Sequence, residues 1–166
     1  MTKPRVIMDE RGRPTPLLPA DPQGAWSALG WFGLLLFLVG MGDFVLAFFP
    51  AAFGSPEWEF GTVASVFAGL PLGTIGLAAL LASGLARGRR GLVLGIGILA
   101  LLLSLTIGVL LVIFLTDVPV ALKTVQGEVL LGVKKAVLKT VLLGILFGVA
   151  YLYAGFRAVR VARRKG

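Results

Sequence analysis

Four long stretches that are almost free of charge limit what this chain can fold into. The first, 25–49, is interrupted only by Asp43; the stretches 60–85 and 92–115 carry no charge, and the fourth, 136–159, has a basic residue near each end. Each exceeds the roughly 20 residues that a helix needs to cross a bilayer. Because lipid offers the backbone no hydrogen-bond partner, such stretches must be helical. The sequence therefore predicts an all-α protein, a bundle of four transmembrane helices.

The composition excludes several classes of protein. Hydrophobic residues make up 57% of the 166 residues and charged residues 14%, whereas a soluble domain carries about 25% charged residues. The chain has no Cys and no His, which excludes disulfides, Cys/His zinc sites and histidine-dependent catalytic triads. No phosphate loop, dinucleotide motif or metal-binding spacing occurs. We expect no catalytic residue, no cofactor and no metal, and therefore not an enzyme.

The basic residues predict how the chain is threaded. With a cytoplasmic N-terminus, twelve of the 16 basic residues, including every Arg, fall on the cytoplasmic side. The outer parts hold the other four, which are Lys123, Lys134, Lys135 and Lys139. Positive charge marks the cytoplasmic side of membrane proteins. We therefore expect both termini to lie in the cytoplasm. The Gly- and Arg-rich, Cys-free composition favours the plasma membrane of a bacterium as the location of the protein. We therefore interpret the net charge of +8 as a sign of contact with anionic lipid headgroups and not of binding to nucleic acid.

The membrane domain is predicted to cover 25–159, with a tail at each end. Residues 1–24 contain five of the nine prolines, a composition typical of a flexible tail. Residues 160–166 form a short basic tail on the same, cytoplasmic side.

The segment 118–138 differs from both the spans and the ordinary loops. At 100° per residue most of its Val and Leu residues fall on one side and its lysines on the other, as in an amphipathic helix. Asp117 is placed to cap the start and Pro119 to sit in the first turn. We expect an amphipathic segment on the outer side before the fourth span. It either lies flat on the membrane, continues straight into that span, or offers its apolar face to a partner.

Small residues predict how the helices meet. In lipid, helices associate through close backbone packing, for which pairs of glycines four residues apart are typical. Three spans carry such pairs, and the six residues are Gly69, Gly73, Gly91, Gly95, Gly144 and Gly148. Pro71, near the middle of the second span, removes one backbone hydrogen bond and predicts a kink. The pattern favours a tight bundle that also allows self-association.

Asp43 is the most informative single residue. It lies about 9 Å below the outer end of the first span at 1.5 Å per residue. An acidic residue there costs roughly 2.5–3.5 kcal/mol and normally faces the bundle interior or water. We expect it to pair with Lys139, in the outer part of the fourth span. Two interpretations stay open: a structural ion pair between the first and fourth helices, or a carboxylate that exchanges protons or cations.

Three functions follow from these patterns. The favoured one is an accessory or scaffold subunit, packed in a larger membrane complex with other subunits or with copies of itself. The alternative is a small cation- or proton-coupled transporter that uses Asp43. A minor alternative is a membrane enzyme, for which five acids near the outer face could hold a divalent cation. Those acids are Asp43, Glu57, Glu59, Asp117 and Glu128.

Overall fold

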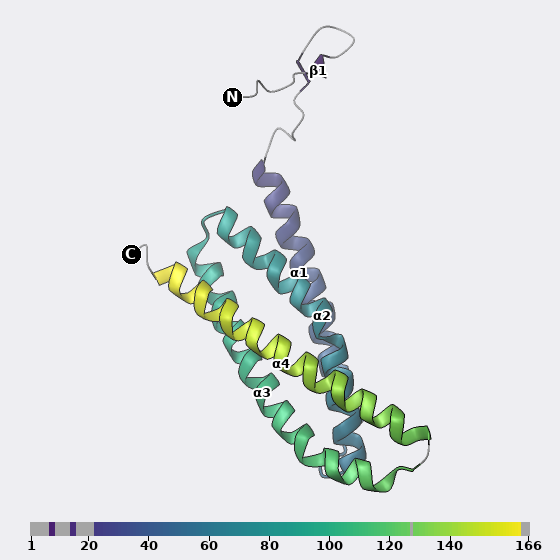
Figure 1. Cartoon of the computed structure of the whole chain (residues 1–166). Coiled ribbons are helices and arrows are strands. Elements are labelled where there is room, and N and C mark those ends of the chain that lie inside the picture. Colours follow the sequence, from purple (N-terminus) through teal and green to yellow (C-terminus); the bar gives the residue numbers. More distant parts are fainter. Residues whose placement is uncertain (1–6, 9–13, 16–21, 127, 164–166) are drawn as a thin grey trace, which may run out of the picture.

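A bundle of four helices forms the protein (Figure 1). The computed structural model describes residues 7–8, 14–15, 22–126 and 128–163. The helices are α1 (Pro22–Leu46), α2 (Pro56–Ala86), α3 (Arg90–Thr124) and α4 (Glu128–Arg163). In the predicted N-terminal tail, β1 (Ile7–Met8) pairs with β2 (Pro14–Thr15) as antiparallel strands. The rest of that tail before Pro22, and residues 164–166, lie outside the described residues.

All four helices are long and apolar enough to cross a membrane, as the sequence predicts. The candidate spans are 24 to 35 residues long, with mean hydropathy between 1.9 and 3.1. The prediction of a four-helix bundle whose helices all have the length and composition of membrane spans is therefore confirmed. The 35 residues of α3 extend over about 52 Å, against about 30 Å for the hydrocarbon core. The helix therefore either tilts or projects beyond the lipid.

The segment 118–138 is not one amphipathic helix, so that expectation is wrong, although its alternative of continuing into the fourth span holds for residues 128–138. Its first seven residues continue α3, which ends at Thr124 where Val125 turns extended, and its last part opens α4. Pro119 consequently lies inside α3 and not in a first turn. The physical reason is that Val118 and Val137 pack against the hydrophobic core. The apolar face thus closes the α3–α4 hairpin, and α4 continues through Gly132 into its span.

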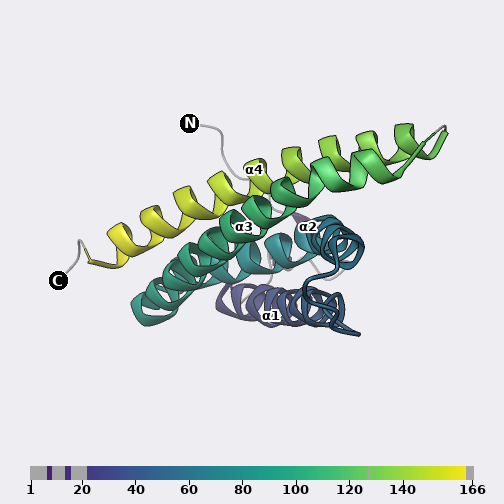
Figure 2. The same ribbon diagram turned by 90° about the horizontal axis from the view of Figure 1, so that it is seen from below.

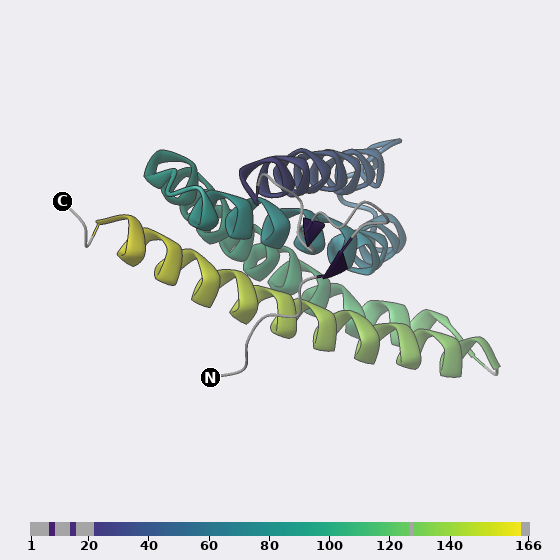
Figure 3. The same ribbon diagram turned by 90° about the horizontal axis from the view of Figure 1, so that it is seen from above.

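The helices pack as two hairpins joined through α2. Helix α1 lies against α2, and α3 lies against α4, while α2 also contacts α3 and α4. Among the described elements α1 packs its backbone against α2 alone. Figures 2 and 3 show this asymmetry, with α1 at the edge of the bundle on the far side from α4. Most of the circumference of α1 is therefore open.

The core sits where α2, α3 and α4 meet. Phe67 and Phe114 are completely buried, and the ring of Phe60 stacks on that of Phe114 with centroids 4.8 Å apart. Tyr151 of α4 is also buried. Helix α1 adds only half-buried side chains to this core, among them Phe37. The inner faces thus hold aromatic side chains, while the outward faces expose Leu, Val and Phe to lipid.

Glycines set the contact between α1 and α2. A Cβ built on Gly33 would lie 2.8 Å from the carbonyl oxygen of Gly76. A Cβ built on Gly40 would lie 2.8 Å from the backbone nitrogen and Cα of Gly73. No side chain fits at such distances, so the two backbones touch in the manner typical of membrane helices.

The six glycines predicted in helix packing behave differently from one another. A Cβ on Gly144 would lie 2.8 Å from the ring of Phe67, and one on Gly148 would lie 3.5 Å from Ile107. Gly73 takes part through Gly40. Three others have open space, because a Cβ there would meet nothing within 4 Å: Gly69, Gly91 and Gly95. The expectation of close packing at these three is not met, because Gly69 borders a cavity and Gly91 and Gly95 are exposed.

Pro71 lies inside α2, as its position in the sequence predicts. The helix continues without interruption on both sides of it. The kink itself stays a prediction.

Candidate functional site

Asp43 lies close to the middle of the bundle along its length. It is one turn after Gly40, which touches Gly73 near the centre of α2. Three residues of helix correspond to about 4.5 Å. The side chain is therefore level with residues 66–69 of α2, with which it lines a cavity.

The Asp43 side chain is exposed on the surface of the protein. No charged residue is buried within the described part of the chain. Lys139 is also exposed, and it belongs to α4, which α1 does not contact. The expected pairing of Asp43 with Lys139, and the inward orientation of Asp43, are therefore both wrong for a single copy of the chain. The reason is that α1 packs on α2 at the edge of the bundle.

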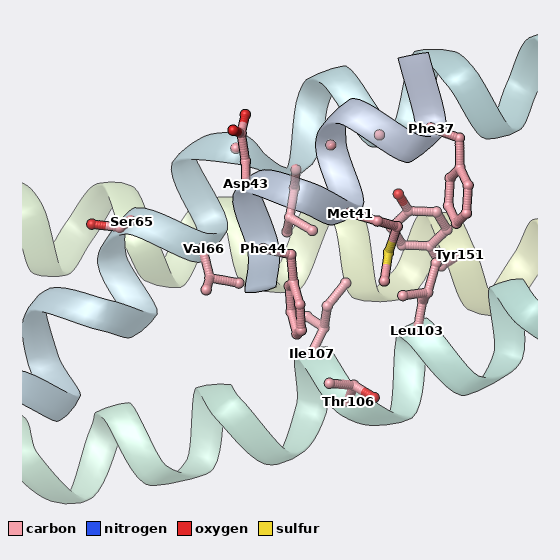
Figure 4. Close-up of a pocket in the computed structure, with 14 residues that line it drawn as sticks. Phe37, Met41, Asp43, Phe44, Ser65, Val66, Leu103, Thr106, Ile107 and Tyr151 are labelled. Carbon is pink, nitrogen blue, oxygen red and sulfur yellow. The ribbon is translucent and has the colours of Figure 1, made fainter. Parts of the chain in front are cut away.

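A small cavity lies beside Asp43, lined by residues of α1, α2 and α3 and by Tyr151 of α4. Its volume is about 40 Å³, which gives room for a few water molecules at most. Its lining is largely apolar and includes Phe37, Phe44, Leu103 and Ile107. Figure 4 shows that the carboxylate of Asp43 points away from these side chains, so no charged group points into the cavity.

A buried hydroxyl pair joins α2 to α4 near this cavity. The Thr74 Oγ1 lies 2.7 Å from the carbonyl oxygen of Leu70 and 2.8 Å from the Tyr151 hydroxyl. The Thr74 hydroxyl has one proton, which it donates to Leu70, so Tyr151 must donate to Thr74. Both groups are thereby satisfied. The pair serves as a polar contact between helices and has no free donor for a ligand.

Other small polar residues also connect helices. Ser83, almost fully buried, donates to the carbonyl oxygen of Trp26 at 2.7 Å and joins α2 to α1. Ser104 donates to the carbonyl oxygen of Gly148 at 2.9 Å and joins α3 to α4. Nothing in the local sequence distinguishes them from Thr106, which bonds within α3.

The acidic residues at the N-terminal end of α2 accept hydrogen bonds from neighbouring residues. Glu59 accepts a hydrogen bond from the Gly54 backbone at 2.8 Å, and Glu57 accepts one from Ser55 at 3.1 Å. Asp117 of α3 lies beside Glu59, and its buried Oδ2 has no hydrogen-bond partner among the described residues. Over the residues that the structure describes, no group of three acidic side chains could hold a metal ion. The alternative of a divalent-cation site therefore has no support there.

No known protein family matches the sequence, and no curated protein or solved structure is significantly similar to it.

Proposed function

We propose that this chain is a non-catalytic subunit of a membrane assembly, and that it binds other transmembrane helices through the open face of α1. We define the open face by its exposed side chains, which are Phe32, Leu35, Val39, Gly42, Asp43 and Leu46. The observation that carries the proposal is the place of Asp43. It is exposed close to the middle of the bundle, with no partner among the described residues.

The energetics favour a partner helix on this face. A carboxylate directed at lipid costs roughly 2.5–3.5 kcal/mol on the insertion scale, and such residues are normally paired. A neighbouring helix that supplies a cation or a hydrogen-bond donor removes that cost. Gly42 lies next to Asp43 and has open space around it, which allows a second backbone to approach closely.

The partner is either another subunit or a second copy of the chain. In a second copy, the exposed Lys139 on α4 is a cation within a candidate span, although α1 does not reach it within one copy.

The proposal places both termini in the cytoplasm of a bacterial plasma membrane. All the Arg residues that the structure describes are at the end of the bundle where α2 joins α3 and α4 ends (Figure 1).

Site-specific cross-linking tests the proposal. A photo-reactive residue replaces Val39 of the open face in one variant and Leu105, a lipid-exposed position on α3, in the control. In native membranes we expect a discrete cross-linked product from position 39 and none from position 105. Adding Asp43→Leu reduces the product at least about tenfold, since a paired charge is lost. The chain itself is expected to remain folded, because the substitution removes a polar group from lipid.

Two results would overturn the assembly. One is equal cross-linking at the two positions, and the other is a product that Asp43→Leu leaves unchanged. The size of the product distinguishes a second copy from another protein. If the partner is a copy, then exchanging the two charges, Asp43→Lys with Lys139→Asp, restores the product that Asp43→Lys alone abolishes.

The cavity beside Asp43 favours the second candidate, a cation- or proton-coupled transporter. Its support is limited to proximity, because the carboxylate points away from the cavity (Figure 4). Proteoliposomes that contain only this chain separate the two functions. Proton or cation flux that Asp43→Asn abolishes establishes the transporter, and the subunit proposal expects no flux from the chain alone.

A further inference from the structure

A groove with a basic rim lies at the end of the bundle where α2 turns into α3. It has a volume of about 240 Å³ and runs between α1, α2 and the start of α3. Its floor is apolar, from Gly30, Leu34, Leu80 and Leu92. Its rim is cationic and polar, from Arg87, Arg89, Ser27 and Trp31.

The local backbone explains why two arginines reach the same groove. Gly88 adopts a left-handed conformation, with φ at +64°, which lets the chain reverse between α2 and α3 within a few residues. Arg87 and Arg89 therefore stand on either side of one turn. On the floor Gly30 lies against Ser83 without a side chain of its own, so α1 and α2 meet closely beneath the groove.

The two arginines of the groove, Arg87 and Arg89, are not neutralised by a carboxylate from the described part of the chain. Arg87 is half-buried and makes one long contact, from Nη1 to the Ser27 hydroxyl at 3.5 Å. Arg89 is exposed. Neither has a carboxylate partner among the described residues, whose acids all lie outside the groove: Asp43, Glu57, Glu59, Asp117 and Glu128. Because a guanidinium has five N–H donors, most of the donors at this rim are available to an anion.

We propose that the groove binds one anionic phospholipid. The phosphate lies between Arg87 and Arg89, with the Ser27 hydroxyl as a further donor, and an acyl chain lies along the apolar floor. A basic pocket between transmembrane helices is suited to such headgroups, and guanidinium groups bind phosphate through paired hydrogen bonds. The apolar floor commits the site to a lipid, since a free phosphate would use only the rim. The site does not depend on any partner of α1.

Lipid binding to the purified full-length chain tests the proposal. The chain is delipidated in neutral detergent and titrated with phosphatidylglycerol, or with phosphatidylcholine of the same acyl chains, and bound lipid is counted by native mass spectrometry. We expect one tightly bound phosphatidylglycerol. The double variant Arg87→Gln and Arg89→Gln is expected to weaken its binding about thirtyfold. The matched control, Arg160→Gln with Arg163→Gln, removes the same charge from the same end but outside the groove, and is expected to change binding less than about twofold.

The outcomes separate the possible sources of the anion. Equal binding of the two lipids, or equal weakening by both double variants, overturns the site and indicates only general attraction to a charged surface. Binding of inorganic phosphate alone with similar affinity overturns the lipid assignment in favour of a free anion. Because Arg87 also contacts Ser27, the single variant Arg89→Glu at an exposed position repeats the test without risk to the fold. If it leaves phosphatidylglycerol binding unchanged, the proposal fails.

Discussion

Replacing Gly76 by alanine is expected to disrupt the α1–α2 hairpin. The new Cβ would lie 2.7 Å from the carbonyl oxygen of Gly33 and 2.9 Å from the Cα of Phe37. Both are backbone atoms, which cannot rotate away as a side chain can. Overpacking of this kind costs about 3 kcal/mol. Thermal unfolding in detergent, followed by tryptophan fluorescence, is expected to show a large fall in the midpoint for Gly76→Ala.

The matched control on the same helix is Gly69→Ala. A Cβ at that position meets nothing within 4 Å, and alanine is favoured over glycine in a helix by about 1 kcal/mol. The control is therefore expected to be neutral or slightly stabilising. Equal destabilisation by the two substitutions would show that the close approach of α1 to α2 is not what holds the hairpin.

Phe67→Ala is expected to be the most damaging truncation in the core. The side chain is completely buried between α2, α3 and α4, and loss of a core Phe costs about 3–5 kcal/mol in proteins. Phe32, whose side chain is 58% exposed, is the matched control, because lipid replaces the ring that Phe32→Ala removes. A chemical denaturation series in detergent measures both. Similar losses in the free energy of unfolding for Phe67→Ala and Phe32→Ala would place Phe67 outside the core.

A double-mutant cycle measures the coupling between Phe67 of α2 and Gly144 of α4. Gly144→Ala brings a Cβ within 2.8 Å of the Phe67 ring and is expected to destabilise the chain. In the background of Phe67→Leu the clash is relieved, so the cost of Gly144→Ala is expected to fall by at least about 1 kcal/mol, within the range of couplings between contacting residues. Additive effects would mean that α2 and α4 do not meet at these residues.

The helices themselves could be predicted because lipid imposes a simple rule. A long uncharged stretch has no other way to satisfy its backbone, and each of the four stretches corresponds to one helix. The ends of α3 and α4 could not be predicted in the same way. Lys123, Lys134 and Lys135 lie on exposed sides of helices that continue past the hydrophobic stretches, so charge does not mark the helix ends there.

The candidate site was harder to predict, because it depends on which helices meet. The cost of a charge in lipid predicts an inward Asp43, but whether α1 has an inward face at that position depends on contacts distant in sequence. Those contacts are made by Gly33 and Gly40 against Gly73 and Gly76. Spacing of four residues selects Gly69 as readily as Gly73, and it gives no information about which side faces a neighbour.

Cysteine accessibility tests most directly the claim that the chain crosses the membrane four times. The chain has no Cys, so single cysteines report without background. They replace Ala51 in the α1–α2 loop, Gln126 in the α3–α4 turn, Arg89 in the α2–α3 turn and Arg163 at the end of α4. With an impermeant maleimide on intact cells, positions 51 and 126 are expected to react, and positions 89 and 163 only after the membrane is opened. Reaction of 51 and 126 from opposite sides, or of 89 and 163 from opposite sides, would contradict the account.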